Sequence, residues 1–223
     1  MSFIITKEAL KILAMNNASC KVFGEKRVKN LKYLTVCAGA DKDFDYDDLV
    51  ANLPEAGLMY QSIKSFAKYL KRDRIDHLLM LKFLGGQWHI QYVKDQIDVV
   101  DMKKVFGDDF TNNFLFSHIL IVAEIVEIKK HISARYLKGG VNVEIRNLVK
   151  HPFIVDELKI GQKVLIHQAL ILEIEPNDET KRILDAEQSS SKEFMSIAST
   201  ICVVDYEKFW DVKKWTADIL KEL

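Results

Sequence analysis

Cysteine is scarce in this chain, and the few cysteines are not spaced for a common purpose. The 223 residues include three of them, at Cys20, Cys37 and Cys202. Their number is odd and no Cys-x-x-Cys pair occurs, so the spacing indicates neither a disulfide framework nor a zinc knuckle. Free thiols are typical of a reducing compartment, and we therefore expect a cytoplasmic protein.

Long apolar runs and phosphate-binding loops are also missing. No run approaches the roughly 20 apolar residues that a membrane helix needs, and Lys7 and Glu8 interrupt the N-terminus too early for a signal peptide. The sequence contains neither a Gly-rich dinucleotide loop nor a P-loop, so we expect no cofactor. Net charge is absent as well, with 32 basic and 32 acidic residues. This balance excludes a uniformly basic nucleic-acid binder but allows a local basic patch.

The stretch with the clearest strand pattern runs from Ile119 to Glu175. β-Branched and aliphatic residues dominate it, and Gly or Pro stands at the ends of its runs. The pattern predicts a strand at 119–128, two strands at 134–146 joined by Gly139-Gly140, and further strand structure at 161–174. We expect these strands to form a small antiparallel, barrel-like sheet.

Helices and strands alternate without regular order outside this stretch. Helices are predicted at 6–15, at 59–70, at 206–223, and through Leu53 with Asp45 or Asp47 as the cap. Other expected elements are hairpins at 21–37 and 77–93, a linker or short helix at 95–106, loops at 107–113 and 188–192, a short helix at 180–186 and a strand at 194–204. This mixture indicates the α+β class, with a mixed region at 1–113 and a barrel-like domain at 114–223 closed by a C-terminal amphipathic helix.

The order of elements in residues 119–205 carries a resemblance. A long strand, a hairpin, a short polar connection, a strand led by Gly161 and a final strand follow one another. This order resembles the OB-fold barrel of single-stranded nucleic-acid-binding proteins. The resemblance rests on this pattern, and it implies a barrel whose outer face contacts a single strand.

Charge is distributed unevenly along the neutral chain. Six basic residues and His131 lie between Lys129 and Lys150 against the single acid Glu144, whereas residues from Pro152 onward carry nine basic and fourteen acidic side chains. Cations that follow phosphates, with an aromatic ring that stacks a base, are what single-strand binding requires. We therefore expect a non-enzymatic nucleic-acid-binding protein that prefers single strands, with contacts from Lys129, Lys130, Arg135, Tyr136, Lys138 and Arg146, assisted by Lys64, Lys68 and Arg72.

Two other functions remain open on the sequence alone. The first is a protein–protein adaptor or inhibitor, in which Trp210 and Trp215 on the C-terminal helix anchor a protein partner or a second copy. The second is metal-dependent phosphodiester cleavage. His89-Ile90-Gln91, with Tyr136 and Lys138, is similar to the motifs of rolling-circle replication initiators, and Asp109 with Glu127-Ile128-Lys129 has the form of a restriction-enzyme type nuclease site.

Overall fold

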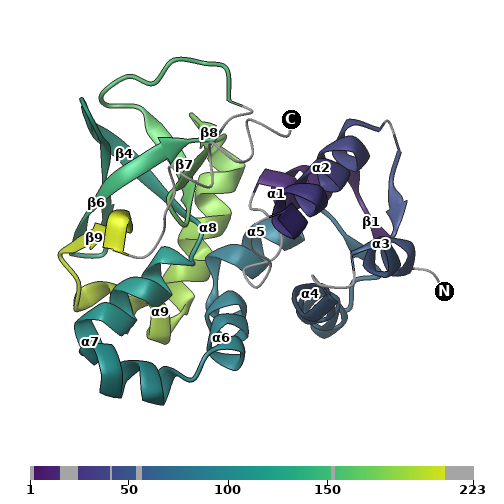
Figure 1. Ribbon diagram of the computed structural model, residues 1–223, viewed down its shortest axis with the longest axis horizontal. Helices are drawn as coiled ribbons and strands as arrows, with labels where there is room; N and C mark the ends of the chain where they lie inside the picture. The colour runs from purple at the N-terminus through teal and green to yellow at the C-terminus, as the bar shows by residue number, and fades with distance from the viewer. Residues whose placement is uncertain (1–2, 16–24, 41, 54–56, 152–153, 209–223) are drawn as a thin grey trace. The chain divides into compact units, whose positions relative to one another are not determined.

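The computed structural model describes residues 3–15, 25–40, 42–53, 57–151 and 154–208. It confirms the mixed α+β class, with a closed five-stranded barrel in the C-terminal half (Figure 1). The chain divides into two compact units, the first reaching Phe83 and the second beginning at Leu84. Residue 113, expected as the domain boundary, instead falls inside helix α7 (Val99–Ser117).

Unit 1 consists of helices around a small sheet. Its helices are α1 (Lys7–Met15), α2 (Glu25–Gly39), α3 (Tyr46–Asn52), α4 (Gly57–Tyr69) and α5 (His77–Gly85), which crosses the division between the units. Strands β1 (Ile4–Ile5), β2 (Phe44–Asp45) and β3 (Arg74–Ile75) form the sheet in the order β2-β1-β3. The helices predicted at 6–15, at 59–70 and through Leu53 are confirmed. Asp45 caps α3, because its carboxylate accepts the backbone N–H of Asp47 at 2.8 Å.

Both predicted hairpins of the N-terminal half are wrong where the structure describes them. Residues 25–39 form α2, in which Asn30, Leu34 and Cys37 are buried at helical spacing, while 16–24 lie outside the described residues. Residues 77–96 form α5 and α6 (Gln87–Gln96). Every residue from Leu79 to Leu84 except Lys82 is buried, so α5 has no polar face and its apolar run has no helical period. Gly86 is the N-cap of α6 rather than a hairpin turn.

Unit 2 is built on the predicted barrel. Its strands are β4 (Ile121–Ile128), β5 (Ile132–Lys138), β6 (Val141–Lys150), β7 (Lys163–His167) and β8 (Leu170–Ile174). The first strand of the barrel, β4, pairs with both β5 and β7; β6 pairs with β5 and, in parallel, with β8; and β7 pairs with β8 to close the barrel. This arrangement is compatible with an OB-like barrel.

Helices precede and follow the barrel strands along the chain. Besides α6 and α7, unit 2 contains α8 (Asp178–Ser190), α9 (Lys192–Ser199), a short strand β9 (Val203–Asp205) beside β6, and a 3₁₀ turn at Tyr206–Lys208 (Figure 1). The predicted loop at 107–113 is wrong, because α7 continues through it with a break at Gly107, where φ is 84°. The loop predicted at 188–192 and most of the strand predicted at 194–204 are also wrong. Ser191 ends α8 and caps α9 by accepting the N–H of Phe194 at 3.1 Å.

The C-terminal helix predicted at 206–223 lies almost entirely outside the described residues, and so do Trp210 and Trp215. The described part of this segment is the 3₁₀ turn, in which Tyr206 is buried. None of the helices in the described ranges is long and apolar enough to cross a membrane.

Candidate nucleic-acid interface

Arg135 occupies the centre of the barrel's outer face. Residues of a strand point alternately to its two sides, and on β5 the exposed Arg135 lies between the buried Ala134 and Tyr136. The strand register places Arg135 opposite Glu124 of β4 on one side and opposite Glu144 of β6 on the other. A cation therefore stands between two carboxylates in a row across three strands.

Further ion pairs extend this row. The Arg146 guanidinium donates two hydrogen bonds of 2.9 Å to the Glu144 carboxylate, and Lys163 donates to Glu124 at 2.6 Å. The hydrogen bond from Arg146 lowers the pKa of Glu144, and the hydrogen bond from Lys163 lowers the pKa of Glu124. The outer face thus carries cations that are already paired, at solvent-exposed positions, with acids of the same face.

Lys129 and Lys130 lie in the connection between β4 and β5. The Lys129 side chain is 79% exposed and forms an ion pair with Glu127, which raises the pKa of Lys129. Lys130 is also exposed. In OB-like barrels the connection between the first and second strands, together with the face of the second and third, contacts the nucleic acid. The structure places both lysines in that connection.

Tyr136 and Lys138 have structural positions that correct the expected stacking contact. Tyr136 is 2% exposed, and its hydroxyl donates to the side-chain oxygen of Gln188 in α8 at 3.0 Å. Burial also raises the pKa of Tyr136. Lys138 is 11% exposed and donates to the backbone and carboxylate oxygens of Asp185 at 2.6 and 2.9 Å. Tyr136 therefore has no open ring face for a base, and both residues hold β5 against α8.

Lys64, Lys68 and Arg72 belong to unit 1, in α4 and just after it. Lys64 donates to Asp47 at 2.6 Å, and its ammonium lies 5.0 Å from the centre of the Tyr46 ring. Arg72 is paired with Asp76, whereas Lys68 is exposed. Lys64 therefore has a structural role within its own unit, whereas Lys68 has no ion pair with a residue that the structure describes.

Basic residues outnumber acidic ones from β4 to β6, counted with the connections between these strands. No protein-family model, curated protein or solved structure matches this chain. The barrel and its charges are therefore the basis for any functional assignment. From Ile121 to Lys150 the chain has six basic residues against three acidic ones: Lys129, Lys130, Arg135, Lys138, Arg146 and Lys150 against Glu124, Glu127 and Glu144.

The residues proposed for phosphodiester cleavage do not form a metal site. His89 is fully buried on a helix, with its Nε2 atom 3.5 Å from Nε2 of His167, whereas Gln91 is exposed and donates to Asp95. Asp109 is exposed on α7, and Glu127 is engaged by Lys129. Within the described ranges, no three His, Cys, Asp or Glu side chains are grouped as metal ligands.

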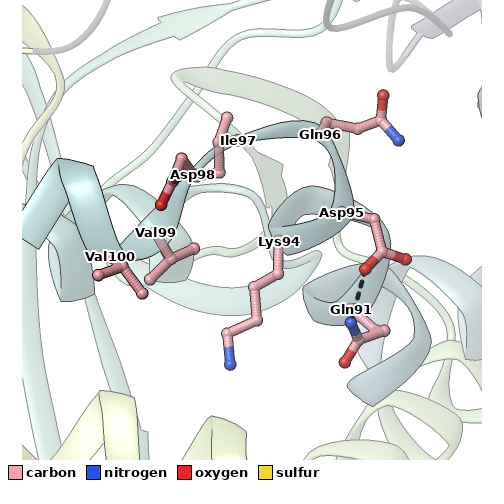
Figure 2. Close-up of a pocket in the computed structure, with 8 residues that line it drawn as sticks. All are labelled: Gln91, Lys94, Asp95, Gln96, Ile97, Asp98, Val99 and Val100. Atoms are coloured by element: carbon pink, nitrogen blue, oxygen red, sulfur yellow. Dashed lines mark hydrogen bonds between the residues drawn. The ribbon is translucent and has the colours of Figure 1, made fainter.

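An open depression lies at the turn between α6 and α7 (Figure 2). Four of its five polar side chains have structural partners, whereas the Oε1 atom of Gln96 is buried without a hydrogen-bond partner among the described residues. Asp98 caps α7 by accepting the N–H of Asp101 at 2.9 Å, Lys94 pairs with Glu193 of α9, and Gln91 donates to Asp95 at 2.7 Å. The depression is thus the junction between two helices. It contributes no binding group to the barrel face.

Proposed function

We propose that this protein is a non-enzymatic nucleic-acid-binding protein that prefers single strands and contacts them with the outer face of β4–β6. Arg135 and Arg146 contact phosphates from the face, and Lys129 and Lys130 contact them from the β4–β5 connection. The observation that carries the proposal is the closed five-stranded barrel with OB-like strand pairing, combined with the excess of basic residues between Ile121 and Lys150.

The paired acids determine how such a surface binds. A phosphate must replace Glu144 at Arg146 and compete with Glu124 and Glu144 for Arg135. Exposed ion pairs contribute little to stability, so this exchange costs little. Each phosphate contact also releases counterions, which makes the affinity depend on salt. The proposal therefore implies binding that is moderate in strength, independent of sequence and weakened by salt.

Substitutions on the face are expected to change the affinity in opposite directions. Replacing Arg135 and Arg146 together with Ala removes two phosphate contacts and should weaken binding by about tenfold or more at low salt. Glu144→Gln frees Arg146 and removes a negative charge, so it should tighten binding by about two- to threefold. Fluorescence anisotropy with a labelled deoxythymidine oligonucleotide measures both. Lys104→Ala, on exposed α7, is the matched control and should leave the affinity unchanged; equal affinities for all four proteins would reject this face.

A second proposed function is protein binding through α7. Val100, Val105 and Phe106 are 64%, 70% and 59% exposed, and the Phe106 ring stacks on Phe110 with centres 4.8 Å apart. Several exposed apolar side chains on one half-helix are typical of an interaction surface. If a protein partner binds this surface, Val105→Asp and Phe106→Asp should abolish the binding of that partner and leave the affinity for the oligonucleotide unchanged.

A further inference from the structure

The C-terminal end of α4 presents an aromatic ring to solvent. Tyr69 is 69% exposed, more than any other aromatic side chain in the described part of the chain. Lys68 precedes it, and Lys71 and Arg72 follow after Leu70; all three cations are exposed. Four neighbouring residues of unit 1 therefore place an exposed aromatic ring between cations.

Lys68 and Lys71 differ from the other cations near Tyr69. Lys64 is bound to Asp47, Arg72 to Asp76 and Arg74 to Asp43. Lys68 and Lys71, by contrast, form no ion pair with any residue that the structure describes. Both lysines are exposed, and the ligand that matches their charge is an anion.

The backbone at Lys71 points to a requirement for its side chain. Lys71 has φ of 55°, and the bonds from Lys71 N–H to Lys68 O (2.9 Å) and from Arg72 N–H to Ala67 O (2.8 Å) form a Schellman motif. Glycine is the usual residue at this position because a side chain is disfavoured in the left-handed region. Strained positions of this kind cluster at functional sites. Attraction to the helix dipole explains a cation near the end of α4, but it explains neither the left-handed lysine nor the exposed ring.

The charge of the chain before Leu84 has the sign that a polyanion requires. Of the 32 basic and 32 acidic residues, fourteen basic and ten acidic ones precede Leu84, which leaves eighteen and twenty-two for the rest of the chain. The chain before Leu84 is thus the basic part of a neutral protein. Long-range attraction of a polyanion is therefore stronger toward this part than toward the remainder.

We propose that Tyr69, Lys68 and Lys71 form a second contact site for single-stranded nucleic acid, in which Tyr69 stacks on a base and the two lysines bind the flanking phosphates. Stacking on an aromatic ring is independent of base identity, and cations beside the ring follow the backbone. The inference rests on the proposed nucleic-acid binding but not on the barrel face. It also supplies an exposed ring, whereas Tyr136 is buried. Two sites on one chain strengthen each other on a strand that reaches both.

The test uses the full chain and a labelled deoxythymidine oligonucleotide. Tyr69→Ala is expected to weaken binding by about tenfold, within the range for loss of one stacked base, whereas Tyr69→Phe retains the ring and the affinity. Lys71→Gly is expected to raise the Tm and weaken binding, because glycine relieves the backbone and removes a phosphate contact. Val36→Ala, which alters another exposed apolar side chain of unit 1 (71% exposed), is the control.

The outcomes separate this inference from the proposed function. If Tyr69→Ala binds like the wild type while the Arg135 and Arg146 substitutions weaken binding, this inference is overturned and the barrel proposal stands. The reverse result supports the Tyr69 site and overturns the barrel face. A wild-type chain that binds no oligonucleotide overturns both. Photo-crosslinking to an oligonucleotide with 5-iodouracil adds a direct readout: an adduct on Tyr69 supports the site, and adducts found only elsewhere contradict it.

Discussion

Lowering the pH from 7 to 5 is expected to destabilise unit 2 by several kcal/mol. His89, His118, His151 and His167 are each no more than 2% exposed. Burial lowers the pKa of His118 and that of His151 from 6.5 to about 4. Burial, followed by the proximity of His167 and His118, also lowers the pKa of His89 well below its ordinary value. The folded unit therefore keeps the imidazoles of His89, His118 and His151 neutral.

The sign of the effect follows from proton binding. Between the folded and unfolded pKa values, the unfolded chain binds protons that the folded unit does not bind, so stability falls as the pH falls. His118 and His151 should each contribute a loss of about 2 kcal/mol at pH 5, and His89 adds to this loss. A loss of this size is a large part of the total stability of an ordinary domain. The stabilisation is fully restored above the unfolded value of about 6.5.

Urea unfolding at a series of pH values measures this loss. The slope between pH 6 and pH 5 should correspond to uptake of roughly two to three protons on unfolding. His118→Gln should reduce that slope by about one proton. Ser189→Ala, which alters an exposed side chain that does not titrate, should leave it unchanged. Hydrogen exchange in peptides from β4 to β8 would assign the change to unit 2, and a stability that is constant from pH 7 to pH 5 would contradict this account of the buried histidines.

Replacing Gln188 with Leu is expected to lower the free energy of unfolding by about 2–4 kcal/mol, because it leaves two buried polar groups unsatisfied. Gln188 is 2% exposed, accepts the Tyr136 hydroxyl at 3.0 Å and donates to the backbone oxygen of Leu120 at 2.9 Å. One side chain thus connects β5, the entry to β4 and α8. Urea unfolding at pH 7 measures the loss, and the exposed Ser189→Ala substitution on the same helix is the control.

A double substitution isolates the hydrogen bond between Tyr136 and Gln188. Tyr136→Phe removes the hydroxyl that Gln188→Leu would leave unsatisfied. The loss of unfolding free energy in the double variant should therefore be smaller than the sum of the losses in the two single variants. Strict additivity would show that Tyr136 and Gln188 do not interact in solution. This cycle also tests the structural role assigned here to Tyr136.

The first three strands of the barrel were predictable because each of them has one largely buried and one largely exposed side. In β4, Ile121, Ala123 and Ile125 are buried at alternate positions, and in β6 Val141 and Val143 continue the same period of two. The Gly139-Gly140 turn is confirmed by its backbone, with φ of 55° and 84° at the two glycines. Pattern and turn chemistry together therefore determine the hairpin that leads the sheet.

The helices that were predicted as strands were missed for different reasons. The apolar run of α5 is buried on all sides, so neither period is visible in it. In α9, Phe194, Ile197 and Ala198 are buried at helical spacing, and Ser191 is a helix cap. That cap was the sequence signal for α9, but the three serines before Lys192 favoured a loop.

The candidate site was only half predictable. Strand parity alone separates Arg135 from Tyr136, because neighbouring residues of a strand cannot share a face; the expected cation-and-ring face was therefore impossible on β5. Lys138 pairs with Asp185, which lies 47 residues away along the chain. No local sequence pattern predicts this pairing. The acids Glu124 and Glu144 became part of the site only when the register placed them beside Arg135.

The salt dependence of oligonucleotide binding by the full chain tests the proposed function most directly. Anisotropy titrations between roughly 50 and 200 mM salt give the slope of log affinity against log salt, which is about −0.7 for each phosphate neutralised on a single strand. Four barrel cations, Lys129, Lys130, Arg135 and Arg146, predict a slope of about −3, reduced by about 1.4 when both arginines are replaced. Binding that does not change with salt, or no binding at low salt, would contradict the proposal.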